Sequence, residues 1–176
     1  MLAGSIPSGM DDDVYAELTR FANSVGAKVI LDADTAKLKL GIEAKPYAIK
    51  PNLYEFELLT GKTLDTADKI VSEAQSLIQK GIELVVVSMG ADGAVFVNKD
   101  SSYKAEPFYI DCQSTVGAGD SMVAALAYSL HRGNALEETA KLCVAAGSIT
   151  SSKAGTQVCT KEEVLKRKDD VKIFAL

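Results

Sequence analysis

The sequence predicts a doubly wound α/β domain, with helices on both faces of a mainly parallel sheet in an α/β/α arrangement of three layers. Short apolar runs typical of buried strands alternate with segments whose apolar residues recur at helical spacing. The connections between these segments are short. No internal repeat, low-complexity segment or interdomain linker interrupts the 176 residues, so we expect residues 1–176 to form a single domain.

In the first part of the chain, strands and helices are predicted in alternation. The opening residues, MLAG, are typical of an apolar strand that turns at once. A helix is predicted after the acidic residues 11–13, with apolar side chains on one face: Val14, Leu18, Phe21, Ala22 and Val25. Strands are then expected at 27–34 and 47–52, and helices at 53–61 and 66–81.

The second part begins with ELVVVSMG, whose run of valines is typical of a strand buried on both faces of a parallel sheet. Two short strands with a hairpin-like connection are expected at 93–98 and 102–108. The segment EPFYIDCQ predicts a strand followed by a turn. Helices are predicted at 118–131, at 135–151 with a break near Gly147, and at 161–168.

The composition argues against several classes of protein. The net charge is −5, and the 19 basic residues do not cluster, which argues against nucleic acid as a partner. Three widely spaced cysteines and a single histidine leave almost nothing for a zinc site. The longest apolar run is too short for a bilayer, and no signal peptide is found. We therefore expect a cytoplasmic protein without a membrane partner.

The segment STVGAGDS lies between a predicted turn and a predicted helix. Backbone N–H groups at a helix start have no partner in the helix, and the helix dipole adds positive charge there. Gly117, Ala118 and Gly119 therefore suit a site for an anion such as a transferring phosphate group, with Asp120 in the first helical turn. The alternative is a tight turn followed by an acid that the helix dipole favours.

The segment PNLYE places Asn52 and Glu55 three residues apart at a predicted helix start. This spacing is typical of a capping box. The same two side chains could also reach a magnesium ion through water, so both interpretations stay open. Lys50 lies just before them, either as a solvated lysine at a strand end or as a partner of phosphate.

Two further segments are rich in small residues. In an open parallel sheet, ligands bind beyond the carboxyl ends of the strands, where the segment SMGADG lies. Its candidates for nucleotide binding are Ser88, Gly90, Ala91, Asp92 and Gly93, although simple turn formation explains them equally well. The segment AAGSITSSKAGT, around Ala146, Gly147 and Gly155, could admit a flat purine ring or merely permit close helix packing.

Four segments, in order, resemble motifs of the PfkB-type sugar kinases, which have the ribokinase-like fold. GSIPSG resembles the family's Gly-Ser-x-Pro-x-Gly turn on the substrate side, and IKPNLYE resembles its Lys-Pro-Asn-x-x-Glu segment. VSMGADGAVFV resembles its nucleotide-phosphate strand and loop, and STVGAGDSMVAALA resembles its C-terminal signature. The resemblance covers essentially the whole chain.

The resemblance implies an ATP-dependent enzyme that uses magnesium. Asp120 would accept the proton of the acceptor hydroxyl as general base. Gly117, Ala118, Gly119 and the amide of Asp120 would hold the charge that develops on the transferred phosphoryl group.

The resemblance also assigns residues to ligands. Asn52 and Glu55 would organise Mg²⁺ through water, with Lys50 near the ATP phosphates. Residues 88–93 would line the phosphates and ribose of ATP. The residues beside adenine would be Ala146, Gly147 and Gly155, and those beside the sugar would be Gly4, Ser5 and Asp120.

Within the family, the chain is most similar to kinases of phosphorylated ketohexoses. The expected reaction converts fructose 1-phosphate to fructose 1,6-bisphosphate, tagatose 6-phosphate is the alternative substrate, and a noncatalytic nucleotide-binding module is a further alternative. Family members carry a comparable stretch before the Gly-Ser-x-Pro-x-Gly turn, with most of the sugar-contacting residues, the first strands of the sheet and a small β lid. The resemblance therefore implies a C-terminal, ATP-side part of such a kinase, with a homo-oligomer as a possible assembly.

Overall fold

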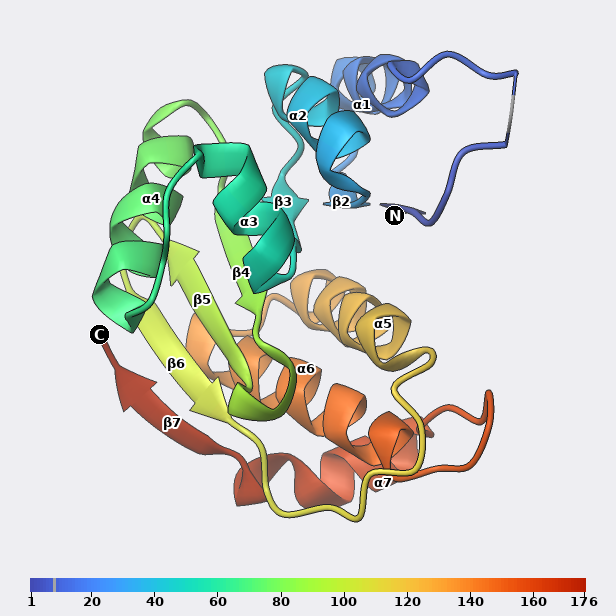
Figure 1. The fold of residues 1–176 in the computed structure, drawn as a ribbon, viewed down its shortest axis with the longest axis vertical. Coiled ribbons are helices and arrows are strands. Elements are labelled where there is room, and N and C mark those ends of the chain that lie inside the picture. The colour runs from blue at the N-terminus through green and yellow to red at the C-terminus, as the bar shows by residue number, and fades with distance from the viewer. Residues whose placement is uncertain (8) are drawn as a thin grey trace. The chain divides into compact units, whose positions relative to one another are not determined.

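A computed structural model describes residues 1–7 and 9–176 of the chain, and Figure 1 shows their helices and strands in the order of the sequence. The described residues form two compact units. Unit 1 consists of Met1–Met89 and Val97–Ser101, and unit 2 consists of Gly90–Phe96 and Ser102–Leu176.

Unit 1 contains parallel strands that pair side by side. They are β1 (Leu2–Ala3), β2 (Ile30–Asp32), β3 (Ala48–Ile49) and β4 (Leu84–Ser88). Leu31 of β2 lies opposite Leu2 of β1 and Ile49 of β3, and Ile49 lies opposite Val85 of β4. The helices of this unit are α1 (Val14–Ser24), α2 (Thr35–Glu43), α3 (Leu53–Thr60) and α4 (Ala67–Gln79).

Local sequence signals explain the helices of unit 1. Helix α4 begins at Thr66, whose side chain accepts a hydrogen bond from the Lys69 amide, and it buries Ile70, Ala74 and Leu77 on one face. Helix α3 ends at Gly61, which adopts the left-handed conformation that favours glycine. The predicted valine strand is β4, and its valines are buried.

Unit 2 contains the C-terminal helices and an antiparallel strand pair. Its short 3-10 turns are η1 (Gly90–Asp92) and η2 (Lys168–Asp170), and its helices are α5 (Ala118–Arg132), α6 (Leu136–Ser151) and α7 (Lys161–Arg167). Strand β6 (Ser102–Glu106) pairs with β7 (Lys172–Ala175), with Ala105 opposite Ile173. Strand β5 (Ala94–Asn98) contributes residues to both units, and within unit 1 the paired strands follow one another in chain order from β1 to β4. The predicted α/β class is thus confirmed.

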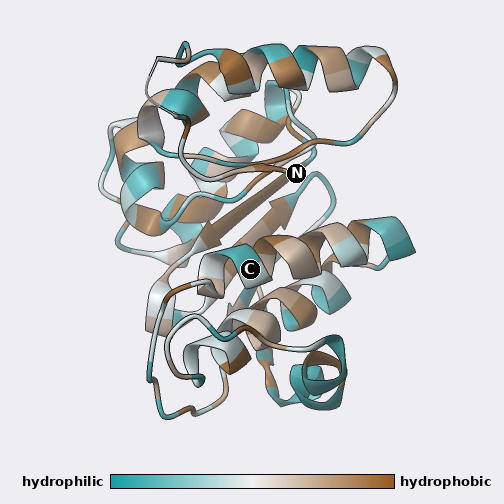
Figure 2. Cartoon of the chain, turned by 90° about the vertical axis from the view of Figure 1, so that its right-hand side faces the viewer, coloured by the Kyte–Doolittle hydropathy of each residue, from teal (hydrophilic) through white to brown (hydrophobic). Residues whose placement is uncertain are grey.

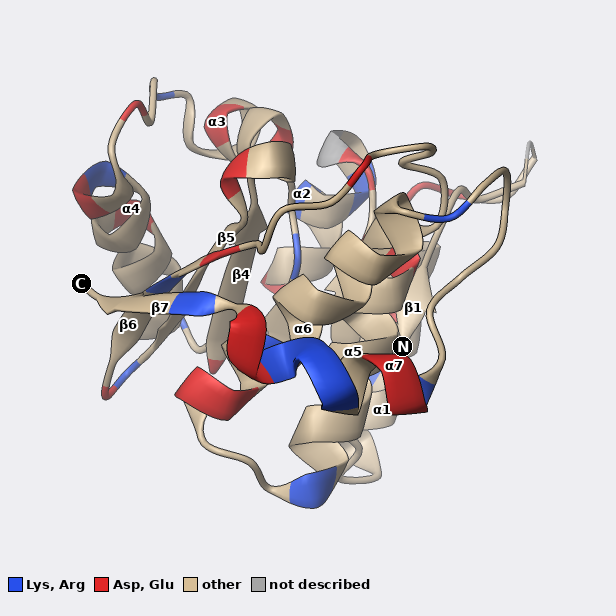
Figure 3. Ribbon diagram, turned by 90° about the horizontal axis from the view of Figure 1, so that it is seen from below, with Lys and Arg blue, Asp and Glu red and all other residues tan. Residues whose placement is uncertain are grey.

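Helix α6 forms the centre of unit 2. It packs against α5, α7 and β6, and its residues 142–150 are buried throughout. In Figure 2, the strand arrows visible near the centre are coloured mainly brown, for hydrophobic residues, whereas the helices carry both brown and teal. Figure 3 shows a basic stretch at the end of α7 followed by acidic residues in η2, so charge is concentrated at the surface just before β7.

Two expectations about unit 2 are wrong. Helix α6 runs without a break through Gly147, because this glycine lies in close contact with Met122 of α5 and is held inside the helix. The strand expected in EPFYIDCQ ends at Glu106, and the following residues form no strand. There, the amides of Gln113 and Ser114 donate to the carbonyl oxygen of Ser151 at 2.9 and 3.2 Å, so the loop is anchored to α6 instead.

Two elements were not expected from the sequence. Helix α2 begins at Asp34, whose side chain accepts a hydrogen bond from the Lys37 amide, and strand β7 forms at the C-terminal end of the chain. A tight turn, in which the Asn98 amide donates to the Ser101 carbonyl oxygen at 3.0 Å, joins β5 to β6 as the expected hairpin requires.

In the described part of the chain, none of the helices has the length and apolar character that crossing a membrane requires.

Candidate functional site

The carboxyl ends of β2, β3 and β4 bring predicted residues together in unit 1. Lys50 directly follows β3, and its amide donates to the Leu31 carbonyl oxygen at 3.1 Å. Ser88 ends β4, and its amide donates to the Pro51 carbonyl oxygen at 3.0 Å. Asn52 and Ser88 form a parallel β-bridge. Lys50, Asn52 and Ser88 therefore lie where open parallel sheets bind ligands.

Lys50 is a buried cation. Its side chain is only 6% exposed, and its Nζ atom lies 3.1 Å from Oδ2 of Asp32, at the end of β2. The interpretation of Lys50 as a solvated lysine is therefore wrong, because an acidic partner within the fold replaces water. Contact of Lys50 with phosphate stays a prediction.

Asp32 is a residue of this site that the sequence did not single out. Its carboxylate pairs with Lys50, and its carbonyl oxygen accepts a hydrogen bond from the Gly4 amide at 3.2 Å. The Tyr15 hydroxyl donates to the carbonyl oxygens of Ala3 and Gly4 at 2.9 and 3.1 Å. The start of the predicted substrate turn, Gly4 and the adjoining Ser5, is thus fixed beside Asp32, whereas Ser8 of that turn lies outside the described residues. The sequence signal that could have pointed to Asp32 is that the strand predicted at 27–34 ends in carboxylates.

Asn52 and Glu55 form a capping box at the start of α3. The Glu55 amide donates to Oδ1 of Asn52 at 2.8 Å, and the Asn52 amide donates to Oε2 of Glu55 at 2.9 Å. The capping interpretation is therefore confirmed. The two cap bonds do not use Oε1 of Glu55, so a role of Glu55 toward magnesium stays a prediction. No group of three or more potential metal-binding His, Cys, Asp or Glu residues occurs in the described residues.

In unit 2, the predicted anion site lies at the start of α5. Gly117 is the residue before the helix, with a φ of +79°, a conformation that glycine adopts without strain. The Ala118 amide donates to the Thr115 carbonyl oxygen at 3.3 Å. The amides of Gly119 and Asp120 belong to the first turn, where helical geometry provides no partner, so they can receive an anion.

Asp120 is exposed, whereas the next residue anchors the helix start. The Ser121 amide donates to the Gly117 carbonyl oxygen at 2.9 Å, and the Ser121 hydroxyl lies 2.8 Å from the Thr150 hydroxyl oxygen. The Cys159 amide donates to the same Thr150 oxygen at 2.9 Å. The first turn of α5 is therefore tied to α6 and to the segment before α7, while the Asp120 carboxylate remains accessible. Such a carboxylate can accept a proton from a bound hydroxyl group.

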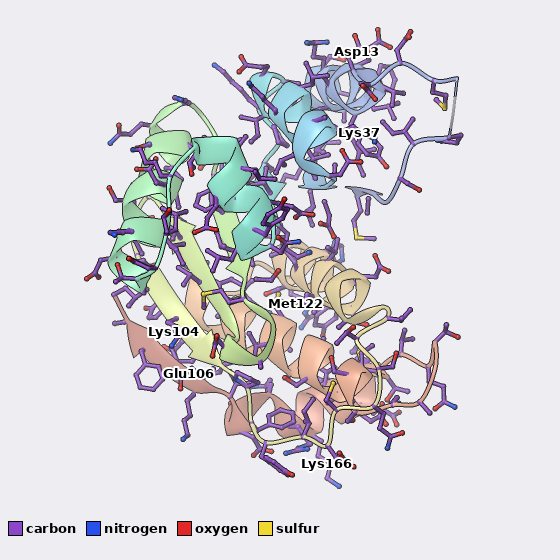
Figure 4. All side chains as sticks on the ribbon, in the orientation of Figure 1. Asp13, Lys37, Lys104, Glu106, Met122 and Lys166 are labelled. Carbon is purple, nitrogen blue, oxygen red and sulfur yellow. The ribbon has the colours of Figure 1, made fainter. Side chains whose placement is uncertain are left out.

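A cavity of about 370 Å³ lies in unit 2 among α5, α6 and α7. Asp120 and Ala146, which were predicted for different roles, both line it, together with Tyr128, Lys161 and apolar side chains. Gly147 faces α5 instead, because a Cβ atom at this position would lie 3.0 Å from Cγ of Met122, the methionine labelled in Figure 4. Gly147 therefore serves close helix packing, and its contact with adenine stays a prediction, as does that of the exposed Gly155.

The predicted phosphate loop continues into η1. Gly90, Ala91 and Asp92 are exposed and form this turn. Gly93 is buried, and a Cβ atom there would lie 1.9 Å from the Ala105 carbonyl oxygen. Only glycine fits this approach of two backbone segments, so the structure accounts for Gly93 without a ligand.

Helix α7, which borders the cavity, has a capping box of its own. The Thr160 amide donates to Oε2 of Glu163 at 2.7 Å, and Lys153 Nζ lies 2.8 Å from the same oxygen. The hydrogen bond from Lys153, and then that from the Thr160 amide, lower the pKa of Glu163 to about 2. This carboxylate therefore remains ionised well below neutral pH.

The predicted residues thus form two groups, one in each unit. Unit 1 brings Gly4, Lys50, Asn52 and Ser88 to the carboxyl ends of its strands, around Asp32. Unit 2 holds the start of α5 with Asp120, the η1 turn and the small residues of α6.

Comparisons with known proteins point to one family. A model of the pfkB family carbohydrate kinases matches residues 1–163. Two relatives named 1-phosphofructokinase are similar: that of Haemophilus influenzae is 38% identical over 89% of this chain and 50% of its own length, and that of Xanthomonas campestris pv. campestris is 42% identical over 82% and 47%. The chain spans about half the length of these relatives.

A solved structure supports the predicted ribokinase-like fold. The crystal structure of phosphofructokinase-2 from Escherichia coli in complex with substrates and products matches with a TM-score of 0.89 and 32% identity. The match covers 95% of this chain and 55% of that one. This coverage is consistent with the expectation that the first strands of the sheet and the β lid are not part of the chain.

Proposed function

Because the chain belongs to the pfkB family of carbohydrate kinases, we propose that it forms the ATP-binding part of a kinase of phosphorylated ketohexoses. The acceptor that we propose is fructose 1-phosphate, which would be converted to fructose 1,6-bisphosphate. The names of the two relatives from Haemophilus influenzae and Xanthomonas campestris support this choice, and tagatose 6-phosphate is the alternative.

The position of Asp120 is the observation that carries this proposal. Its carboxylate is exposed in the first turn of α5, immediately after the left-handed Gly117 and beside first-turn amides that can receive an anion. Asp120 would accept the proton of the attacking hydroxyl group. The amides of Gly119 and Asp120 would donate to the negative charge that develops on the transferred group. One helix start thus supplies both a base and an anion site.

The residues of unit 1 fit a magnesium–nucleotide complex. When bound, ATP supplies the phosphoryl group, and magnesium neutralises part of the charge of its phosphates. Lys50 offers a cation at the carboxyl ends of the strands, and Glu55 has an oxygen, Oε1, outside its two cap bonds. These residues would hold the complex, Glu55 through water. Ser88 lies beside them, because it forms a β-bridge with Asn52.

The half-length match supports a second candidate, a noncatalytic nucleotide-binding module. Positioning supplies much of the rate of phosphoryl transfer, and the resemblance assigns most of the sugar contacts to a stretch that is not part of these 176 residues. The isolated chain should therefore bind ATP without transferring phosphate to sugar, whichever candidate holds. A longer protein that contains the chain should transfer phosphate to sugar only if the first candidate is correct.

Two measurements test the proposal. Isothermal titration calorimetry of the chain with ATP and Mg²⁺ should detect binding, and a chain that binds no ATP would contradict both candidates. A coupled assay of ADP release, run on a longer protein that contains the chain with fructose 1-phosphate and with tagatose 6-phosphate, should show sugar-dependent turnover. ATP binding without turnover with either sugar would favour the noncatalytic module.

A further inference from the structure

We infer that Asp32 is a positioning residue, whose carboxylate holds the ammonium group of Lys50 in place to contact the phosphate groups of the nucleotide. The inference rests on the proposed function, because it concerns the same nucleotide site. Neither the sequence motifs nor the comparisons assign any role to Asp32.

The strand register places the two side chains opposite one another. Ile30 lies opposite Ala48, and Leu31 lies opposite Ile49, in the parallel pair of β2 and β3. One residue further along, Asp32 therefore comes opposite Lys50, and Lys50 Nζ lies 3.1 Å from Asp32 Oδ2. Because the backbone of both strands fixes this pairing, the ammonium group has one preferred position rather than the many that a flexible lysine side chain adopts.

Burial makes the acidic partner necessary. The Lys50 side chain is 6% exposed and that of Asp32 is 19% exposed. An ammonium group removed from water without a partner loses its charge or turns back to solvent, because burial disfavours the charged form. Asp32 holds the buried ammonium group in place before any nucleotide arrives. A cation that is already ordered loses less conformational entropy when it binds phosphate.

The surroundings of the pair connect it to the nucleotide site. An ammonium group has three N–H donors, so one bond to Asp32 leaves donors for a second acceptor. Lys50 is separated from Asn52 by one residue, and Asn52 is bridged to Ser88. On its other side, Asp32 accepts the Gly4 amide at the start of the predicted substrate turn. The ion pair therefore lies between the segments assigned to the nucleotide and to the sugar.

A double-mutant cycle on the chain tests this role. Asp32→Asn, Lys50→Met and the double variant are titrated with ATP and Mg²⁺ by calorimetry, and urea unfolding of each is measured in parallel. A charged hydrogen bond contributes about 1.5–3 kcal/mol, so Asp32→Asn and Lys50→Met should each weaken ATP binding about tenfold or more. The double variant should bind no more weakly than Lys50→Met, because Asp32 acts only through Lys50.

A matched control and a conservative variant complete the design. Asp34→Asn removes an exposed carboxylate two residues away whose partner is Lys37 in α2, and it should leave ATP affinity unchanged. Asp32→Glu keeps the charge but displaces it by one methylene group, so it should restore most of the affinity that Asp32→Asn loses. If Asp32→Asn does not fold, the cycle is run with Asp32→Glu, whose smaller loss should vanish in the Lys50→Met background.

The outcomes separate this inference from the proposed function. Tighter ATP binding by a folded Asp32→Asn variant would show that Asp32 competes with phosphate for Lys50, and equal binding would show that Asp32 does not affect ATP affinity. Either result would overturn the positioning role alone. Additive losses in the double variant would also overturn it, since they would mean that Asp32 acts independently of Lys50. Failure of the unmodified chain to bind ATP would overturn the proposed function and the positioning role together.

Discussion

At the scale of single residues, the start of α5 concentrates the proposed chemistry on Asp120. In a kinase that contains this chain, we expect Asp120→Asn to lower kcat about 10²–10⁴-fold, because general bases contribute that much, and to leave ATP affinity nearly unchanged. A coupled assay of ADP release and a calorimetric titration measure the two quantities. Asp111→Asn, in the exposed loop before the helix, is the control. A variant that keeps more than about a tenth of the rate would exclude Asp120 as the base.

Glu55 carries two roles that substitution can separate. Glutamine can keep the capping box, since its side-chain oxygen also accepts from the Asn52 amide. Glu55→Gln should therefore keep the stability but raise the concentration of Mg²⁺ needed for ATP binding. Glu55→Ala should show both effects, with a loss of about 1 kcal/mol in the free energy of unfolding from the missing cap.

Titration of ATP binding with Mg²⁺ and urea unfolding measure these effects on the same variants. Glu163→Gln makes the same substitution at the corresponding position of the α7 capping box and should not change the magnesium requirement. An unchanged magnesium requirement in Glu55→Gln would leave Glu55 with the cap alone.

Most of the candidate residues could be predicted from the sequence because they lie in contiguous motifs. Asn52 and Glu55, and the turn around Gly117, are defined by spacing within a few residues. Asp32 could not be identified in this way, since its importance depends on a strand register with Lys50, 18 positions along the chain. A sequence shows that an acid ends a strand, but not which buried cation lies opposite.

At the scale of elements, the cap of α7 predicts a dependence of stability on pH. The pKa of Glu163 is lowered from 4.5 to about 2, so its stabilisation is complete above about pH 4.5 and is lost as the pH falls toward 2. The unfolding free energy of the chain should exceed that of Glu163→Gln at pH 7, and the difference should shrink below pH 4.5. Because the Glu163 side chain is 42% exposed, we expect a difference below about 1 kcal/mol.

Urea unfolding at a series of pH values measures this difference. Glu162→Gln, at the adjacent exposed position in the same helical turn, is the matched control and should show no such trend. A difference between the chain and Glu163→Gln that stayed constant down to pH 2 would mean that the ionised carboxylate does not stabilise the cap.

The elements that could be predicted are those whose signals are local. Helix α2 escaped prediction because Gly41 interrupts its pattern. A Cβ atom at Gly41 would lie 2.4 Å from Cδ2 of Leu31, so this glycine is required by packing against β2 rather than by a helix end. Strand β7 depends on pairing with β6, about 70 residues earlier, and the last residue confirms this pairing, since the Leu176 amide donates to the Ser102 carbonyl oxygen.

At the scale of the whole molecule, α1 presents an apolar face to solvent. Leu18, Phe21 and Val25, which the helical pattern places on one face, are 43%, 69% and 66% exposed, whereas Tyr15 and Thr19 are buried. We therefore expect the isolated chain to self-associate, since apolar faces of this kind favour association. Sedimentation velocity over a range of concentrations measures the association.

A surface substitution tests whether α1 mediates this association. Phe21→Ser should weaken it, because it removes the most exposed of the three apolar side chains of this face. Tyr109→Ser, at a position that is 92% exposed in a loop of unit 2, is the control for a lost aromatic side chain and should leave association unchanged. A chain that stays monomeric at high concentration would show that α1 is not an association surface.

The close approach at Gly93 also restricts how the gene can change. A side chain at this position meets the Ala105 carbonyl oxygen, which is backbone and cannot rotate away, so every codon that does not encode glycine disrupts the fold. Ala91, exposed two residues earlier in the same turn, carries no such restriction. Under selection for a folded product, position 93 would tolerate only silent changes in the third base of its codon, while position 91 would drift among many amino acids.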